Sequence, residues 1–151
     1  NDGIMLNVRA GSIHAIIGEN GAGKSTAMKL LYGMFKPDAG EILIDGVARE
    51  WRSPSDAIAA GIGMVHQHFM LAGPYDPLEN VVLGAEPSRV SFLPAFLRPI
   101  DRAGAESRLR AIARQNGFTI DWSKPVEELP VGIQQQLEIV KLLYRNARIL
   151  I

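Results

Sequence analysis

The first part of the chain has short apolar runs separated by glycine, proline and aspartate. Residues 12–17 form an apolar, β-branched run that predicts a buried strand. Residues 25–34 carry apolar positions at helical spacing and predict a helix. Glu41 and the apolar residues 42–44 are followed by Asp45-Gly46, a pair that accepts the positive φ values of a type I′ turn, so this segment predicts a β-hairpin.

A second short helix is predicted after the hairpin. Ser53 is a favourable N-cap, Pro54 suits the first helical position, and Gly61 ends the helix. Residues 62–65 then predict a short strand. Strands and helices therefore alternate, which indicates an α/β fold with an antiparallel hairpin and a central parallel sheet.

The second part of the chain is predicted to be mainly helical. Residues 84–100 contain three prolines and predict an irregular, exposed connection. Asp101 is expected to cap an amphipathic helix. Residues 123–128 predict one helical turn, 134–145 a firm helix and 148–151 a strand. A helical subdomain inserted in an α/β core is the expected architecture.

The outer face of the helix after Asp101 carries Arg102, Glu106 and Arg110 at spacings of four. The Glu106–Arg110 order is the favourable one for a helical ion pair. Such a row of charges is expected to be an ordinary solvated face that contributes little to stability.

Composition narrows the function classes. A chain of 151 residues is about one domain. It has 16 basic and 16 acidic residues, so no overall field favours nucleic acid. It has no apolar run long enough to cross a bilayer and no cysteine for a disulfide or a thiolate metal site.

Residues 18–26 carry the clearest chemical signal. They fit the phosphate-binding pattern G-x-x-x-x-G-K-[ST], between a predicted strand and a predicted helix. Glycines bend the backbone so that its N–H groups face an anion, Lys24 adds a positive charge, and the Ser25 hydroxyl is placed to bind Mg²⁺. The predicted nucleotide-binding residues are Gly18, Glu19, Asn20, Gly21, Ala22, Gly23, Lys24, Ser25 and Thr26.

His66 and His68 form a His-x-His pair around Gln67. Two histidines at this spacing can suggest a metal site. The chain has no cysteine, and the pattern offers no third ligand near the pair, so the interpretation as a metal site is disfavoured.

The order of three motifs resembles the nucleotide-binding subunit of ATP-binding cassette (ABC) transporters over essentially the whole chain. The motifs are GENGAGKST at 18–26, GMVHQHFML at 63–71 and LPVGIQQQLEI at 129–139. The last two look most like importers of nucleosides and simple sugars. The resemblance implies a P-loop NTPase core at 1–73, a helical subdomain at 74–133, and a helix and strand at 134–151 that return to the core.

The resemblance also implies roles for single residues. Lys24 and Gln67 would act in catalysis, and Ser25 and Gln67 would bind Mg²⁺, with ATP as the nucleotide. Gln67 would sense the γ-phosphate and relay its presence to whatever docks on the helical subdomain. The signature segment, expected to face a partner cassette, comprises Leu129, Pro130, Val131, Gly132, Ile133 and Gln134.

The signature segment departs from the family's usual L-S-G-G-Q. Pro130 replaces the serine, Val131 the first glycine and Ile133 the glutamine, while Gly132 remains. Proline has neither a hydroxyl nor an N–H group, so one or two hydrogen bonds to phosphate would be lost, each worth roughly 1.5–3 kcal/mol. A weakened composite ATP site is therefore expected.

By the same resemblance, the expected partners are a second cassette and membrane permease subunits, at the cytoplasmic face of the membrane, and not nucleic acid. The family's aspartate and glutamate would follow Ile151, so residues 1–151 alone are expected not to hydrolyse ATP. Two alternatives stay open: a cassette ATPase that does not serve transport, and a regulatory nucleotide-binding module without turnover.

Overall fold

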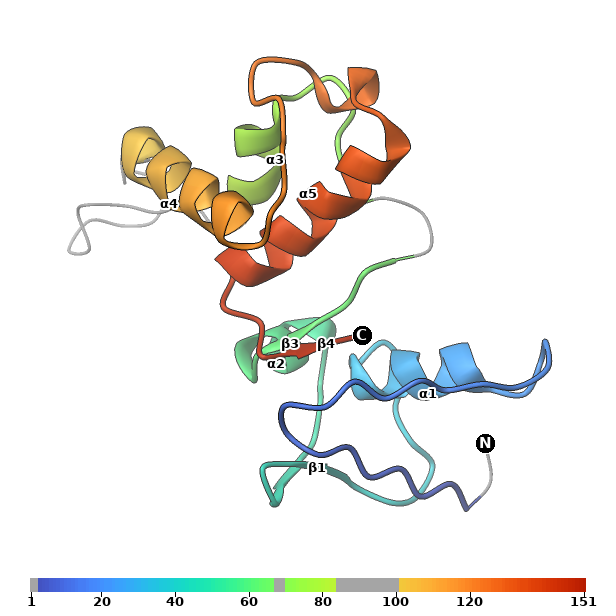
Figure 1. The fold of residues 1–151 in the computed structure, drawn as a ribbon. Helices are drawn as coiled ribbons and strands as arrows, with labels where there is room; N and C mark the ends of the chain where they lie inside the picture. Colours follow the sequence, from blue (N-terminus) through green and yellow to red (C-terminus); the bar gives the residue numbers. More distant parts are fainter. Residues whose placement is uncertain (1–2, 67–69, 84–100) are drawn as a thin grey trace. The chain divides into compact units, whose positions relative to one another are not determined.

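The computed structural model describes residues 3–66, 70–83 and 101–151, which divide into two compact units (Figure 1). One unit comprises residues 1–62 with Ile151, and the other comprises residues 63–150. The division thus falls at Ile62–Gly63. The expected boundaries after residues 73 and 133 stay predictions.

The first unit contains the helix and the hairpin that the sequence predicts. Helix α1 spans Lys24–Leu31, shorter than the expected 25–34 at its C-terminal end. Strands β1 (Ile42–Ile44) and β2 (Val47–Arg49) pair antiparallel. Between them, Asp45 has a φ of 52° and Gly46 a φ of 76°, as a type I′ turn requires. The predicted hairpin is confirmed.

Helix α2 (Pro54–Ala59) begins and ends where the sequence predicts. The Asp56 carboxylate accepts hydrogen bonds from the backbone N–H groups of Arg52, at 2.8 Å, and Ser53, at 3.2 Å. It therefore fixes the chain at the helix start. At the other end Gly61 has a φ of 87°, which suits glycine and stops the helix.

The strand predicted at 12–17 is wrong for this structure. Residues 12–17 are exposed and form no regular element; Ile13 and Ile17 are 102% and 92% exposed. A strand needs a neighbour for its N–H and C=O groups, and no strand among the described residues pairs with this run. Composition alone therefore predicted an element that depends on a distant partner.

The structure explains why position 33 is a glycine. Its φ is +76°, and an added Cβ would lie 2.9 Å from the Ser53 carbonyl oxygen and 3.1 Å from the Trp51 Cβ. A side chain at this position would be strained and would collide with backbone. Glycine therefore lets the end of α1 approach the segment before α2.

Short strands β3 (Ile62–Gly63) and β4 (Ile149–Leu150) make a second two-stranded sheet. The predicted strands at 62–65 and 148–151 are thus present but shorter. Gly63 is buried, and a Cβ there would lie 3.0 Å from the Ala147 Cβ. The close approach explains why a glycine stands here.

The second unit is helical (Figure 1). Its helices are α3 (Pro77–Val82), α4 (Arg102–Gln115), a 3₁₀ turn at Val126–Glu128 and α5 (Val131–Tyr144). Its core gathers apolar side chains from all four, together with neighbouring residues; they are Leu78, Val81, Val82, Ala105, Leu109, Ala113, Ile120, Val126, Leu129, Leu137, Val140 and Tyr144. The helix predicted after Asp101 is confirmed. The turn predicted at 123–128 is present but covers only Val126–Glu128, and the helix predicted at 134–145 is present but begins at Val131 and ends at Tyr144. The connection predicted at 84–100 lies outside the described residues.

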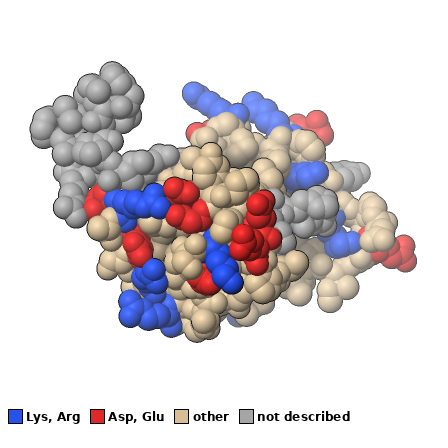
Figure 2. Space-filling model, turned by 90° about the horizontal axis from the view of Figure 1, so that it is seen from above, with Lys and Arg blue, Asp and Glu red and all other residues tan. Residues whose placement is uncertain are grey.

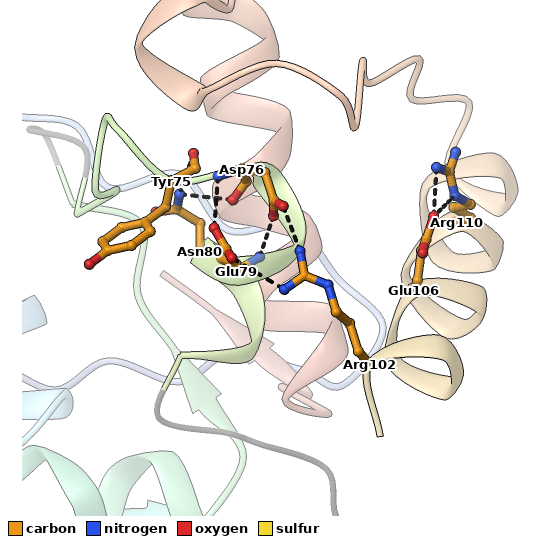
Figure 3. Close-up of polar contacts among 7 residues, drawn as sticks. All are labelled: Tyr75, Asp76, Glu79, Asn80, Arg102, Glu106 and Arg110. Carbon is orange, nitrogen blue, oxygen red and sulfur yellow. Dashed lines mark hydrogen bonds and ion pairs between the residues drawn. The ribbon is translucent and has the colours of Figure 1, made fainter. Parts of the chain in front are cut away.

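The charged face of α4 differs from its expected arrangement. Glu106 and Arg110 pair as predicted, with nitrogen and oxygen 2.7 Å apart. Arg102 instead reaches the start of α3, where it lies 2.8 Å from the N-cap Asp76 and 3.2 Å from Glu79 (Figure 3). A hydrogen bond to Glu79 and the charge of Asp76 raise the pKa of Arg102. Arg102, which was expected to be part of the solvated row, therefore links the start of α4 to the start of α3.

Asn80 on α3 is buried, 4% exposed, and its amide holds the turn before the helix. Its Nδ2 donates to the carbonyl oxygens of Ala72 (3.0 Å), Tyr75 (3.2 Å) and Asp76 (3.1 Å). Its Oδ1 accepts from the Ala72 N–H at 2.6 Å. All of its polar atoms are satisfied, so the turn and the helix are joined in one arrangement.

We expect Asn80→Ala to lower the free energy of unfolding by about 2–3 kcal/mol, because buried backbone groups lose their partner. Urea denaturation followed by circular dichroism measures the change. Asn116→Ala is the matched control, since Asn116 is exposed and its amide donates to the Ile112 carbonyl, one turn away on the same helix, at 2.9 Å. Equal losses in the two variants would contradict a special role for Asn80.

Candidate functional site

The loop before α1 has the backbone geometry of an anion-binding turn. Gly21 has a φ of 86° and Gly23 a φ of 87°, both in the left-handed region that favours glycine. Gly23 is also the N-cap of α1, so the loop runs directly into a helix N-terminus. The first amides of a helix lack acceptors within the helix and carry a partial positive charge. The predicted relation of loop and helix is present.

The Lys24 side chain folds back over the loop. Its Nζ donates to the carbonyl oxygens of Gly18 and Glu19, both at 2.6 Å. The Ala22 N–H donates to the same Glu19 carbonyl at 3.2 Å. The ammonium group therefore lies at the loop and stabilises its curvature, within reach of any anion that the loop amides bind.

The remaining loop residues are open to solvent. Glu19, Asn20, Ser25 and Thr26 are exposed, and Ser25 and Thr26 lie in the first turn of α1. A Cβ on Gly21 would meet nothing within 4 Å, so only its φ demands glycine. This donor set fits a nucleotide phosphate: helix amides and an ammonium for the anion, and an exposed hydroxyl for its Mg²⁺.

Gln67 and His68 lie outside the described residues, so their roles stay predictions. His66 is half-buried. Among residues 3–66, 70–83 and 101–151, no cluster of three or more histidine, aspartate or glutamate residues is arranged to hold a metal ion.

The signature segment forms the start of α5. Leu129 is buried in the helical core, whereas Pro130, Val131 and Gly132 are exposed. Pro130 is the N-cap, with a φ of −54° and a ψ of 145°. Its exposed neighbours present the helix N-terminus to solvent, where the helix dipole favours an anion.

Pro130 keeps one function of a helix cap. Its carbonyl oxygen accepts from the N–H groups of Ile133 at 2.8 Å and Gln134 at 3.0 Å. The Gln134 side chain turns back and donates to the Leu129 carbonyl at 2.8 Å. A Cβ on Gly132 would meet nothing within 4 Å. The helix therefore still begins normally with the substituted residues. Compared with the usual motif, Pro130 lacks the hydroxyl and the N–H group of a serine.

Two residues of α5 hold a contact that sequence reasoning missed. The Glu138 carboxylate accepts from the Met70 N–H at 2.8 Å, and Lys141 Nζ donates to the Met70 carbonyl at 3.0 Å. Glu138 is 3% exposed. The available signal was a glutamate within the apolar run Leu137–Tyr144, because a buried carboxylate requires a partner.

Comparisons with known proteins agree with this geometry. The family model of ABC transporters matches residues 1–151, so the chain belongs to the ABC transporter family. The chain is 45% identical to a glucose import ATP-binding protein of Haloferax volcanii and 46% identical to a guanosine import ATP-binding protein of Bacillus subtilis. The matches cover 100% of this chain but only 31% and 28% of those proteins. The chain thus spans about a third of their length.

A solved structure has the same fold. It is cbiO1 from Clostridium perfringens, part of the ABC transporter complex cbiONQ. The TM-score is 0.76 at 26% identity, over 97% of this chain and 55% of that one. The predicted α/β P-loop fold class with a helical subdomain is confirmed, as is the predicted resemblance to ABC nucleotide-binding subunits.

We expect Lys24→Ala to weaken Mg-ATP binding at least about tenfold, because the loss of a charge-assisted hydrogen bond is worth about 1.5 kcal/mol or more. Titration of the full-length protein with Mg-ATP measures the dissociation constant. Lys36→Ala is the matched control, since that exposed lysine pairs with the exposed Glu50. An unchanged dissociation constant in the Lys24 variant would contradict the assignment of this loop as the nucleotide-binding site.

Proposed function

We propose that this chain belongs to the ATP-binding and ATP-hydrolysing subunit of an ABC transporter that takes up a nucleoside or a simple sugar. The observation that supports this most is the loop at 18–23, with its left-handed glycines, entering α1 under the Lys24 ammonium. Such a loop binds a nucleotide through its phosphates.

The chain's own groups have distinct tasks in this proposal. Loop amides and the α1 N-terminus hold the β-phosphate, and Lys24 leaves the Gly18 and Glu19 carbonyls to bind the β- and γ-phosphates. Ser25 and Gln67 would hold Mg²⁺, which supplies charge neutralisation at the transferred phosphoryl group. Catalysis then consists mainly of positioning and electrostatic stabilisation.

Gln67 is proposed to orient the attacking water and to report the γ-phosphate to the helical unit. Its place in the chain supports this: three residues later, Met70 is bonded to α5, the helix that begins at the signature segment. The amide oxygen suits Mg²⁺, and the whole amide suits a water molecule.

The signature segment is proposed to face the γ-phosphate held by a second cassette. The exposed α5 N-terminus supports anion binding. Without a serine hydroxyl at Pro130, this contact is weaker than in a cassette with the usual motif, by roughly 1.5–3 kcal/mol for each hydrogen bond lost. One of two composite sites would then turn over slowly.

The names of the relatives support import of a nucleoside or a sugar. We propose that the chain works with a second cassette and integral-membrane permease subunits, bound peripherally at the cytoplasmic face of the membrane. No helix in the described part of the chain is long and apolar enough to span a bilayer. Basic and acidic side chains intermingle on the face drawn in Figure 2, which disfavours nucleic acid as a partner there.

The weakened signature segment supports a second candidate, a regulatory cassette that binds ATP without turnover. A cassette of this kind would show ATP affinity with hydrolysis near background, whereas the first candidate hydrolyses ATP in step with uptake. Phosphate release from the full-length protein with its permease separates the two.

We expect Gln67→Ala to leave the ATP dissociation constant within about twofold and to lower the rate of hydrolysis and uptake at least about tenfold, because it removes a contact made mainly in the transition state. ATP titration and steady-state phosphate release measure the two quantities. Gln115→Ala at the exposed end of α4 is the control. Equal losses of binding and of rate would argue that Gln67 is merely structural.

A further inference from the structure

Met70 is held at both of its backbone groups by a single helix. Glu138 accepts from its N–H at 2.8 Å, and Lys141 donates to its carbonyl at 3.0 Å. The two side chains are three residues apart, so they lie on the same face of α5. Met70 as a whole residue is 63% exposed. The contact therefore fixes the path of the main chain and does not depend on packing of Met70.

Burial makes this contact specific. Glu138 is 3% exposed, and a carboxylate removed from water requires a hydrogen-bond donor. Lys141 is half-buried, and that burial lowers its pKa, while the charge of Glu138 opposes the change. Burying either charged group without its hydrogen bond to the Met70 backbone would cost free energy. These hydrogen bonds therefore hold the main chain at Met70 against α5.

A second helix holds the same stretch two residues later. The buried Asn80 side chain bonds both the N–H and the carbonyl of Ala72, at 2.6 Å and 3.0 Å. Side chains from α5 and α3 therefore hold the backbone at residues 70 and 72. This backbone is held without pairing to a strand in the described part of the chain. The main chain therefore has defined hydrogen-bond partners at Met70 and at Ala72.

We propose that Glu138 and Lys141 are positioning residues for Gln67, because they fix Met70 to the helix that starts at the signature segment. This inference rests on the proposed function of Gln67. Three residues of chain span at most about 10 Å, so the position of Met70 limits where Gln67 can reach. Glu138 lies about 10 Å along α5 from Val131, so a shift of the signature helix carries the anchor with it.

The principal variant is Glu138→Leu, which places an apolar side chain of similar size in the buried site and removes the acceptor. We expect ATP hydrolysis by the full-length protein to slow about tenfold or more, with the ATP dissociation constant within about twofold, because misplacement of a positioning group costs rate. Glu138→Gln keeps an acceptor for the Met70 N–H and should restore most of the rate. Glu106→Leu, at an exposed carboxylate paired with Arg110, is the control.

The decisive test combines variants. If Glu138 acts through Gln67, adding Glu138→Leu to Gln67→Ala lowers the rate no further, whereas independent losses would multiply. Multiplied losses, or a Glu138→Leu rate equal to wild type, would overturn the proposal. Lys141→Met, which keeps the aliphatic stem, should slow hydrolysis about threefold in wild type and not at all in Gln67→Ala. This second variant tests the same coupling if Glu138→Leu fails to fold.

The outcomes also separate this inference from the proposed function. Wild-type protein that binds no ATP or hydrolyses none would defeat the proposed function itself. Wild-type hydrolysis that falls in Gln67→Ala but is unchanged in Glu138→Leu and Lys141→Met would defeat only the positioning role.

Discussion

Buried polar side chains that must be satisfied control the arrangement of the helical unit. Asn80 and Glu138 are 4% and 3% exposed, and each forms hydrogen bonds with backbone groups between Met70 and Asp76. An unpaired group at either position would cost about 1–3 kcal/mol or more. The apolar core of this unit brings α3, α4 and α5 together, but it is not directional. The polar contacts select the one path of the connecting chain that places its N–H and C=O groups on these side chains.

The phosphate loop is organised by local constraints of a different kind. Left-handed glycines at 21 and 23 set the turn, and the Lys24 ammonium bonds carbonyls five and six residues earlier. All of these groups lie within one short stretch, so the loop needs little support from the rest of the chain. This explains why it keeps its turn and its helix beside residues 12–17, which have no paired strand among the described residues.

The same difference between local and distant partners decides what the sequence could predict. The hairpin at Asp45-Gly46, the start of α2 and the cap of α4 at Asp101 depend on neighbours a few residues away, and all three were predicted correctly. The sequence places Arg102 in a solvated row because its partners at the start of α3 are more than twenty residues distant, at sequence separations of 23 and 26. The Glu138 contact with Met70 spans 68 residues, so the sequence shows only a carboxylate within an apolar helix and not its partner.

Helix α5 joins the two kinds of feature. Its exposed N-terminus carries the substituted signature segment, where Pro130 removes donors but keeps the helix start through its carbonyl. Its middle holds Met70 through Glu138 and Lys141. These two features lie on one continuous helix, about 10 Å apart along its axis. The Pro130 carbonyl keeps its hydrogen bonds to the N–H groups of Ile133 and Gln134, so the substituted helix start and the Met70 contact are both formed on this one helix.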